Sequence, residues 1–302
     1  ITAEGLRDCV SNSLSGNNQV RFALDREPDS FDVVVNEILY NPQTDGVDYV
    51  ELFNRSQKVI NLKNIYIANL NTSGTIDNIT QLPDDGYLFF PGDCLAFSTD
   101  LFRTKRDYFS TQPDHILYTA SLPSFNDDEG NVILLNHQGA MLDRLHYDDK
   151  WQFPLLDETE GVSLERIHAD GITQDSQNWH SASSTVGYGT PGYRNSQTSD
   201  LNIAAGTIKV SPPVISPDND GRDDIGIINY LFPGPGYKTT MIIYDVLGRP
   251  VKHLAMNVMC GTTGFFQWDG LDDLGRKLLI GNYVIITDVF TVDGVMKRYR
   301  NV

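Results

Sequence analysis

The sequence predicts an all-β protein made of more than one β-sandwich. Short apolar or β-branched runs recur along most of its 302 residues, and Gly, Pro, Asn and Asp separate them. This spacing of strands and turns is typical of sandwiches and barrels. Because 302 residues exceed one ordinary domain, we expect residues 1–30, 31–197 and 198–302 to be separate units.

The first 30 residues are polar and too short to form a domain of their own. Residues 20–24 alternate and predict one strand, and residues 27–30 predict a linker. The stretch at residues 5–12 resembles the end of bacterial surface Ig-like domains. The chain starts with Ile1 and shows no signal peptide. We therefore expect residues 1–30 to be the tail of a preceding module, with upstream domains in the same polypeptide.

Residues 31–197 contain strand after strand. The runs are residues 33–35, 49–53, 59–62, 64–67, 87–90, 94–97, 132–135 and 140–145. Residues 49–53 alternate with period two, which predicts a half-buried strand. The last two runs are joined by a turn containing Gly139, which predicts a hairpin. Thr99 and Asp100 are placed to cap one short helix that reaches Tyr108.

Residues 198–302 repeat this style over about 100 residues, a length and spacing that suit an Ig-like sandwich. Strands are expected at residues 240–246, 265–268 and 283–290. Asp293 and Gly294 predict a hairpin return to residues 296–299. Residues 196–206 are polar and predict the linker between the two domains.

The middle region carries several motifs in a fixed order. They are Asn36-Glu37-Ile38, residues 48–56 (DYVELFNRS), 59–62 (VINL), 161–166 (GVSLER), 178–179 (NW) and 189–195 (GTPGYRN). With these motifs, residues 31–197 resemble the lamin-tail domain, an Ig-like β-sandwich found at the end of nuclear lamins and in many bacterial exported proteins.

The polar residues of these motifs have a structural interpretation. Glu51 and Asn54 are expected to tie down loop backbone, and Trp179 is expected to pack. Glu37 and Glu51 could instead form a catalytic carboxylate pair. We favour the structural role because the sequence implies no cleft beside them.

A second set of motifs occupies the last region. They are residues 243–251 (IYDVLGRPV), 268–270 (WDG), 273–276 (DLGR) and 280–283 (IGNY). This region is similar to the Ig-like C-terminal domain of flagellar hook-assembly proteins, which recurs in exported proteins of Bacteroidetes-type bacteria. Residues 216–224 resemble the opening motif of gliding-motility-associated C-terminal domains, which act as export signals. Together the two resemblances predict tandem Ig-like β-sandwiches in an extracellular or outer-surface protein.

An acidic turn at the start of the last region is the best candidate for a metal site. Its oxygen-bearing residues are Asp218, Asn219, Asp220, Asp223 and Asp224, around Gly221. Calcium prefers six to eight hard oxygen ligands around a tight turn. The glutamate that closes an EF-hand loop is missing. The alternative is a turn held by hydrogen bonds from the side chains to its own backbone.

A second acidic turn, Asp127, Asp128 and Glu129, precedes a predicted strand and is a weaker calcium candidate. The formal net charge of −17 disfavours nucleic acid as a partner. Two basic clusters, residues 103–106 and 297–300, are interpreted as solvated surface. Cys9, Cys94 and Cys260 lie far apart, which predicts buried thiols without a disulfide framework or zinc site. No apolar run is long enough to span a bilayer.

The sequence contains no catalytic motif of the G-x-S-x-G, H-E-x-x-H or P-loop kind. Asp175, His180 and Ser181 are close in sequence, but a triad requires orientation across the fold. We therefore expect a non-catalytic structural, adhesive or ligand-binding module that contacts protein or glycan through loops and exposed edge strands. The alternatives are the accessory region of an extracellular hydrolase such as a nuclease, and a calcium-stiffened spacer.

Overall fold

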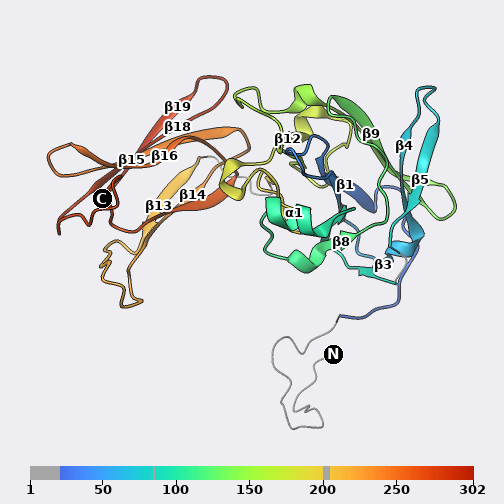
Figure 1. Ribbon diagram of the computed structural model, residues 1–302, viewed down its shortest axis with the longest axis horizontal. Helices are drawn as coiled ribbons and strands as arrows, with labels where there is room; N and C mark the ends of the chain where they lie inside the picture. The colour runs from blue at the N-terminus through green and yellow to red at the C-terminus, as the bar shows by residue number, and fades with distance from the viewer. Residues whose placement is uncertain (1–20, 84–85, 200–204) are drawn as a thin grey trace, which may run out of the picture.

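The computed structural model describes residues 21–83, 86–199 and 205–302 of the chain (Figure 1). Within them the protein is all-β, as predicted. Its strands form two groups of sheets that share no strand. We call residues 31–197 the first sandwich and residues 205–302 the second sandwich. They form the blue-to-yellow and the gold-to-red lobes of Figure 1.

The larger sheet of the first sandwich has six strands. In spatial order they are β12 (Trp179–Ser181), β11 (Leu164–Arg166), β1 (Val33–Leu39), β2 (Tyr49–Asn54), β7 (Cys94–Ser98) and β8 (Ile116–Tyr118). Neighbours are antiparallel except β7 and β8, which are parallel. A parallel pair needs a crossover connection, which here contains the predicted helix, α1 (Leu101–Asp107). Asp100 caps α1 by accepting a hydrogen bond from the Arg103 amide at 3.0 Å.

The facing sheet has four antiparallel strands. They are β10 (Met141–Asp148), β9 (Glu129–Asn136), β4 (Ile65–Leu70) and β5 (Ile76–Gln81), and a small pair, β3 (Ile60–Asn61) with β6 (Leu88–Phe89), closes one side. The predicted β9–β10 hairpin is confirmed. Asn136 Oδ1 accepts the amides of Gln138 and Ala140 at 3.0 and 2.8 Å, and Gly139 has φ of 78°. Glycine adopts this left-handed conformation without steric cost.

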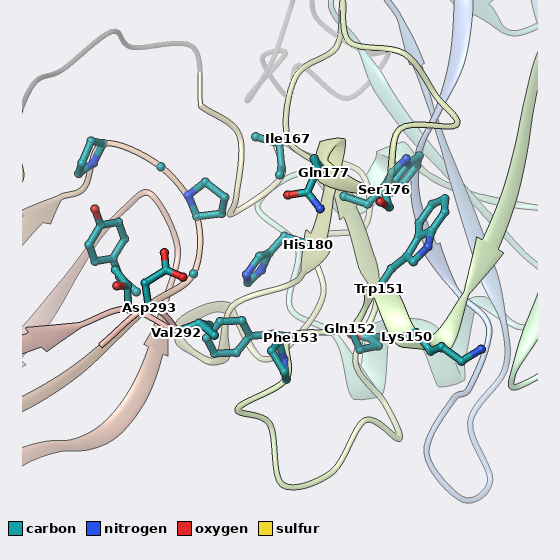
Figure 2. Close-up of a pocket in the computed structure, with 18 residues that line it drawn as sticks. Lys150, Trp151, Gln152, Phe153, Ile167, Ser176, Gln177, His180, Val292 and Asp293 are labelled. Carbon is teal, nitrogen blue, oxygen red and sulfur yellow. The ribbon is translucent and has the colours of Figure 1, made fainter. Parts of the chain in front are cut away.

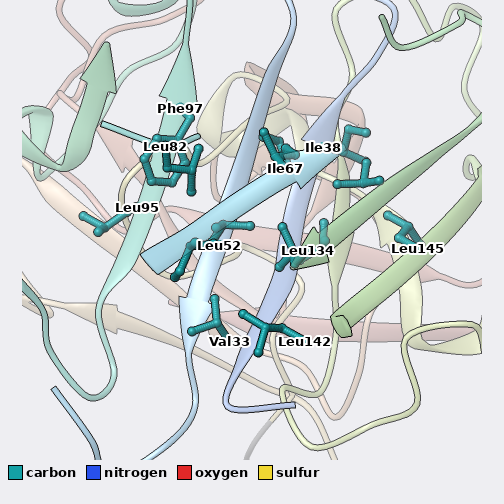
Figure 3. Packing of buried hydrophobic residues seen from close by; sticks show 14 of the residues in the cluster. Val33, Ile38, Leu52, Ile67, Leu82, Leu95, Phe97, Leu134, Leu142 and Leu145 are labelled. Atoms are coloured by element: carbon teal, nitrogen blue, oxygen red, sulfur yellow. The ribbon is translucent and has the colours of Figure 1, made fainter. Parts of the chain in front are cut away.

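Short 3-10 helices occupy the connections of the first sandwich. They are η1 (Leu62–Asn64), η2 (Pro113–His115), η3 (Asp149–Trp151), η4 (Ser176–Asn178) and η5 (Ser184–Val186). The core lies between the two sheets (Figure 3). Val33 and Leu52 of the larger sheet meet Leu134 and Leu145 of the smaller one, all with no exposed surface. Removing such apolar surface from water is the main stabilising contribution.

The second sandwich pairs a three-stranded with a four-stranded antiparallel sheet. The first contains β13 (Thr207–Ser211), β14 (Gly226–Leu231) and β17 (Thr263–Trp268), and the second β16 (Pro250–Cys260), β15 (Tyr237–Tyr244), β18 (Val284–Phe290) and β19 (Met296–Asn301). Burial alternates along β15 and β18, so one face of the sheet points inward. That face packs Met241, Ile243 and Ile285 against Ile228 and Trp268.

Strand β2 differs from its expected half-buried character. Five of its six residues are buried, so both of its faces are covered. The second cover comes from the closing segment, which we define as residues 189–197. Glu51, on the side of β2 expected to be solvated, accepts the Gly192 amide of this segment at 2.6 Å. The alternating residues of β2 therefore face an apolar interior on one side and a polar interior on the other, and neither side faces solvent.

Two expectations about linkers are also corrected. Residues 21–24 form no strand, and Phe22 and Leu24 are exposed; Val20 and residues 1–19, including Cys9, lie outside the described residues. The start of the predicted polar linker is packed rather than free, because Thr262 donates to the carbonyls of Ser196 and Thr198 at 2.9 and 2.7 Å. Residues 200–204 lie outside the described residues.

Cys94 and Cys260 are buried free thiols, as expected. Across the described ranges, no helix has the length and apolar character needed to cross a membrane.

Candidate functional site

The acidic turn before β14 brings together three of its four candidate carboxylates. Carboxylate oxygens of Asp218, Asp220 and Asp224 lie within 4.8 Å of one another, and Asp223 is not part of this group. Asn219 and Asp223 both have left-handed backbone, with φ of 65° and 54°, where the turn bends sharply.

The same carboxylates hold the turn together. Asp224 accepts three backbone amides, those of Asp218 and Asn219 at 3.0 and 2.7 Å and that of Gly221 at 2.9 Å. Asp220 accepts the Arg222 amide at 2.8 Å. These bonds are the side-chain-to-backbone alternative anticipated from the sequence. Three carboxylates supply only part of a calcium shell, and carbonyls and water would have to complete it.

The second acidic turn does not form a comparable group. Among the described residues, the set around Asp218 is the only convergence of three or more His, Cys, Asp or Glu ligand atoms. Asp128 instead accepts the amide of its neighbour Glu129 at 2.8 Å. Nearby, burial and the charge of Asp127 raise the pKa of Asp48 to about 7.

Three glutamates lie side by side in the larger sheet of the first sandwich. Glu37 of β1 pairs in register with Glu51 of β2 and with Glu165 of β11. We call them the glutamate row; all three have no exposed surface. A bulge between Val35 and Glu37 interrupts the pairing of β1 with β2. Such an extra residue re-aims side chains, and here it lets both Asn36 and Glu37 contact the closing segment.

Each carboxylate of the row is hydrogen-bonded to the closing segment. Glu37 accepts the amide and hydroxyl of Thr190 at 2.9 and 3.0 Å, and the Tyr49 hydroxyl at 2.6 Å. Glu165 accepts the Ser196 hydroxyl at 2.8 Å and the Gln197 amide at 2.9 Å. The expectation that Glu51 ties down loop backbone is confirmed. Buried polar groups with such partners hold a segment in one conformation.

Burial dominates the electrostatics of the row. Loss of hydration raises the pKa of Glu37, Glu51 and Glu165, the last to about 8, and the charge of Glu37 adds to the rise at the other two. Because no part of these carboxylates reaches solvent, a substrate has no access to them. The paired-carboxylate interpretation of Glu37 and Glu51 therefore has no support in the geometry. Glu165 was quoted in the sequence only as part of the motif at residues 161–166, and no role was predicted for it.

Asp175, His180 and Ser181 do not form a triad. His180 Nδ1 lies 2.9 Å from the Ser181 carbonyl. The Ser181 hydroxyl is engaged with Gln152 and accepts the Phe153 amide, while Asp175 caps the Gln177 amide at 3.0 Å. The serine and the aspartate thus both bind elsewhere.

A cleft of about 600 Å³ lies between the two sandwiches (Figure 2). One wall comes from η3 and the residues after it, and from η4 and β12, which supply Trp151, Phe153, Gln177 and His180. The other wall comes from residues 233–237 and from the β18–β19 turn at residues 291–293. Its volume falls in the range of about 300–1,000 Å³ that is usual for small-molecule sites.

Direct hydrogen bonds join the two sandwiches beside the cleft. The buried Lys238 ammonium donates to the Leu155 carbonyl at 2.9 Å, and the Ser199 hydroxyl donates to the Pro233 carbonyl at 3.3 Å. Behind the cleft, Ser184 Oγ donates to the Met259 carbonyl at 2.9 Å. Together with the bonds from Thr262, these contacts link the two sandwiches around the cleft.

His180 lies at the meeting point of the two walls. Its Nδ1 faces a carbonyl oxygen and must donate, so Nε2 is left as an acceptor. Burial lowers the pKa of His180, which keeps the ring neutral. The ring lies 4.9 Å from Phe153, centroid to centroid. Gly236, with φ of 81°, faces it, and a Cβ there would lie 3.3 Å from Nε2.

Sequence reasoning missed the cleft as a site. Trp179 and His180 drew attention only as a packing residue and as part of a triad, and the facing residues lie more than 50 positions further along the chain. Trp179 does pack as expected, with 3% exposure and its Nε1 donating to the Thr173 carbonyl at 2.8 Å. No local pattern signals which surface two domains share.

The basic clusters lie on the surface beside acidic partners. Arg106 pairs with Asp107 and Arg298 with Asp288, each at 2.6 Å. Arg103 lies 3.4 Å from Asp100. These exposed pairs fit the expectation of solvated surface.

Comparisons with known proteins leave the family open. No protein-family model matches the chain, and no curated protein matches it. Among solved structures, dimeric latent PorU from Porphyromonas gingivalis aligns with a TM-score of 0.24 and 12% identity, over 92% of this chain and 20% of that one. The exo-chitosanase CsxA of Amycolatopsis orientalis aligns at 0.20 and 12%, over 83% and 25%. A β-D-glucuronidase of Dictyoglomus thermophilum aligns at 0.19 and 12%, over 88% and 42%. The chain thus spans about a fifth to two fifths of these proteins.

Proposed function

We propose that this chain is a non-catalytic ligand-binding module of a multidomain protein on the bacterial cell surface or secreted from the cell. In this proposal a lamin-tail-like sandwich precedes a hook-assembly-type Ig-like sandwich, as the sequence motifs suggest. The observation that carries the proposal is the cleft between the sandwiches. Hydrogen bonds join the two sandwiches beside it, and a binding site formed in advance loses little entropy when a ligand enters.

The burial of the three glutamates of the row supports the non-catalytic part of this proposal. General acid–base catalysis requires a group within hydrogen-bonding reach of the substrate. Glu37, Glu51 and Glu165 are enclosed and bonded to the closing segment. Among the described residues, His180 is hydrogen-bonded to a backbone carbonyl through Nδ1 and forms no ion pair with a carboxylate.

The test uses the tryptophans that line the cleft. Trp151 and Trp179 line it, whereas Trp268 belongs to the second sandwich core. The purified chain would be titrated with neutral hexasaccharides, an oligogalacturonate and a decaproline peptide. Tryptophan emission and the formation of cleavage products from each probe would both be followed. We expect saturable quenching or enhancement by at least one probe and no product.

Turnover of any probe would overturn the non-catalytic assignment. No change in tryptophan emission with any probe would overturn the assignment as a binding module. Antibody labelling of intact cells tests the proposed location: labelling only after lysis would contradict it.

A specific observation also favours a second function, the calcium-stiffened spacer. Asp218, Asp220 and Asp224 converge in the turn that opens the second sandwich. Calcium bound there would stabilise the native state of that sandwich by mass action.

A further inference from the structure

We propose that the cleft binds a neutral oligosaccharide chain, which deepens the proposed function and rests on it. The cleft is lined by residues 150–154, 167, 176–177, 179–180, 233–237 and 291–293. Three features of its lining lead to this ligand class: its charge, its free hydrogen-bonding groups and its aromatic rings.

The charge of the lining differs from that of the chain. Only Lys150 and Asp293 carry full charges at the cleft, one of each sign, in a protein of net charge −17. Lys150 is already paired with Asp148 at 3.2 Å. An acidic ligand would find no free cation at the cleft and would be repelled by the surrounding chain. A strongly basic ligand would find one carboxylate, on an exposed turn. The lining therefore favours a neutral ligand.

The cleft offers neutral donors and acceptors that no described residue uses. His180 Nε2 is an acceptor, and the indole Nε1 of Trp151 is a donor. The Gln177 side-chain amide supplies both, as do the hydroxyls of Ser176 and Tyr237. None of these atoms is both buried and without a hydrogen-bond partner. Because no described residue bonds them, they are accessible to solvent. Hydroxyl groups both donate and accept, so a polyhydroxylated ligand suits this mixture.

Aromatic rings flank the cleft on both walls. Trp151 of the first sandwich and Tyr237 of the second are half-buried, and Phe153 packs beneath His180. Aromatic faces combine a large apolar area with a polar edge. A pyranose ring presents an apolar C–H face and equatorial hydroxyls, which match a ring face and its neighbouring polar atoms. Gly236 keeps the space above His180 open, because its missing side chain would approach Nε2.

An extended peptide that adds to the sheet is a weaker fit. Strand β12 is the edge of the six-stranded sheet at this cleft, and peptide addition uses the free backbone groups of an edge. Here the Trp179 amide donates to the Ser176 carbonyl, and the Ser181 carbonyl accepts the Gln197 side chain at 3.1 Å. These groups of the short edge are already bonded, so it is a poor template.

The experiment is a calorimetric and fluorescence titration of the full chain. Probes are neutral hexasaccharides (cello-, manno- and chito-oligosaccharides), an oligogalacturonate as the charged counterpart, and decaproline. Variants are His180→Phe, which retains the packing on Phe153 but removes the acceptor, and Gln177→Ala. The control is Gln138→Ala, an exposed amide in the β9–β10 turn. Melting temperatures would verify that each variant folds.

We expect at least one neutral hexasaccharide to saturate the wild-type chain. His180→Phe and Gln177→Ala should each weaken binding by about tenfold, and Gln138→Ala should leave it unchanged. Binding of decaproline or oligogalacturonate alone would overturn the oligosaccharide assignment and leave the binding module intact. Sugar binding that both variants retain would place the site elsewhere and overturn the cleft assignment. If no probe binds in either titration, both proposals would be overturned together.

Discussion

The two sandwiches keep their loops in place by different means. In the first, loops are bonded to polar groups enclosed in the protein: the glutamate row holds the closing segment, and buried Arg166 donates to the Gly171 carbonyl at 2.9 Å and the Thr173 hydroxyl at 2.6 Å. In the second, carboxylates such as Asp245 and Asp272 hold surface turns beside Arg249 and Arg276.

This difference separates two sources of stability. The first sandwich depends on a few atoms whose loss leaves buried donors unpaired, and on the protonation of its carboxylates. Both sandwiches also depend on buried apolar area, which is insensitive to pH. In the second, surface aspartates bonded to arginine and backbone add a contribution that is lost only at low pH. The second sandwich also carries more exposed apolar side chains at its far end, where Leu279 and Ile280 are almost fully exposed.

Replacing Glu37 tests the polar interior most directly. Glu37→Ala removes the acceptor of Tyr49, Ser163 and Thr190. Each unsatisfied buried donor costs roughly 1–3 kcal/mol, so we expect the first sandwich to lose about 3–5 kcal/mol of unfolding free energy. Urea denaturation followed by tryptophan emission measures the loss.

Two further variants make the test of Glu37 specific. Glu37→Gln should cost less than the alanine, because the raised pKa already favours an uncharged side chain. Exposed Glu158→Ala is the matched control. A loss for Glu37→Ala no larger than for Glu158→Ala would contradict the role of the row.

A core substitution gives the corresponding test in the second sandwich. Ile243 is fully buried between the sheets. Ile243→Ala should destabilise this sandwich by about 2–4 kcal/mol through lost burial and a cavity, with the same cost at pH 5 and pH 8. The measurement is the denaturation midpoint at both pH values. A cost that changes strongly with pH would show that the second sandwich shares the electrostatic character of the first.

The pH dependence of stability should have opposite sign in the two sandwiches. In the first, the pKa values of Glu37, Glu51 and Glu165 lie above the ordinary 4.5, that of Glu165 at about 8. The native state therefore binds protons more tightly than the unfolded chain. The contribution of these three glutamates to the unfolding free energy is complete below pH 4.5 and is lost as pH rises toward 8.

In the second sandwich, arginine and backbone partners hold the pKa values of Asp245, Asp272 and Asp288 below the ordinary 3.8. Their contribution is present above pH 3.8 and is lost as pH falls further. Urea midpoints from pH 3 to 8.5, with the two transitions assigned by Ile243→Ala and Glu37→Ala, measure both slopes. A first transition that strengthens between pH 5 and 8 would contradict the buried-carboxylate account.

Calcium gives the smallest expected effect and should act on one sandwich only. If the turn of Asp218, Asp220 and Asp224 binds the ion, calcium should raise the melting temperature of the second sandwich by roughly a few degrees, and EDTA should reverse the change. Asp220→Asn should abolish the shift, whereas Asp127→Asn should not. An identical melt with calcium and with EDTA would exclude the calcium-stiffened spacer.

Local sequence was sufficient for most of the fold. The β9–β10 hairpin, the cap of α1 at Asp100 and the strand β15 follow from turn residues, capping and alternation, which act within a few residues. The residues of the acidic turn were also identifiable, because its ligand types are contiguous. The strand predicted at residues 20–24 is absent over the described residues 21–24. They have no neighbouring strand to pair with in the described structure, and an isolated strand is not stable.

The all-β class, many of the strands and several turns follow from the sequence, because they depend on backbone preferences and on the period of apolar residues. Strands β5, β13, β14 and β16 were not predicted. Only the tertiary structure decided that β2 is covered on both sides, that Glu165 joins Glu37 and Glu51, and that Gly236 faces His180 across a cleft. The physical reason is that register, burial and inter-sandwich contacts join residues that are far apart in the chain. Their hydrogen bonds and pKa values arise only where those surfaces meet.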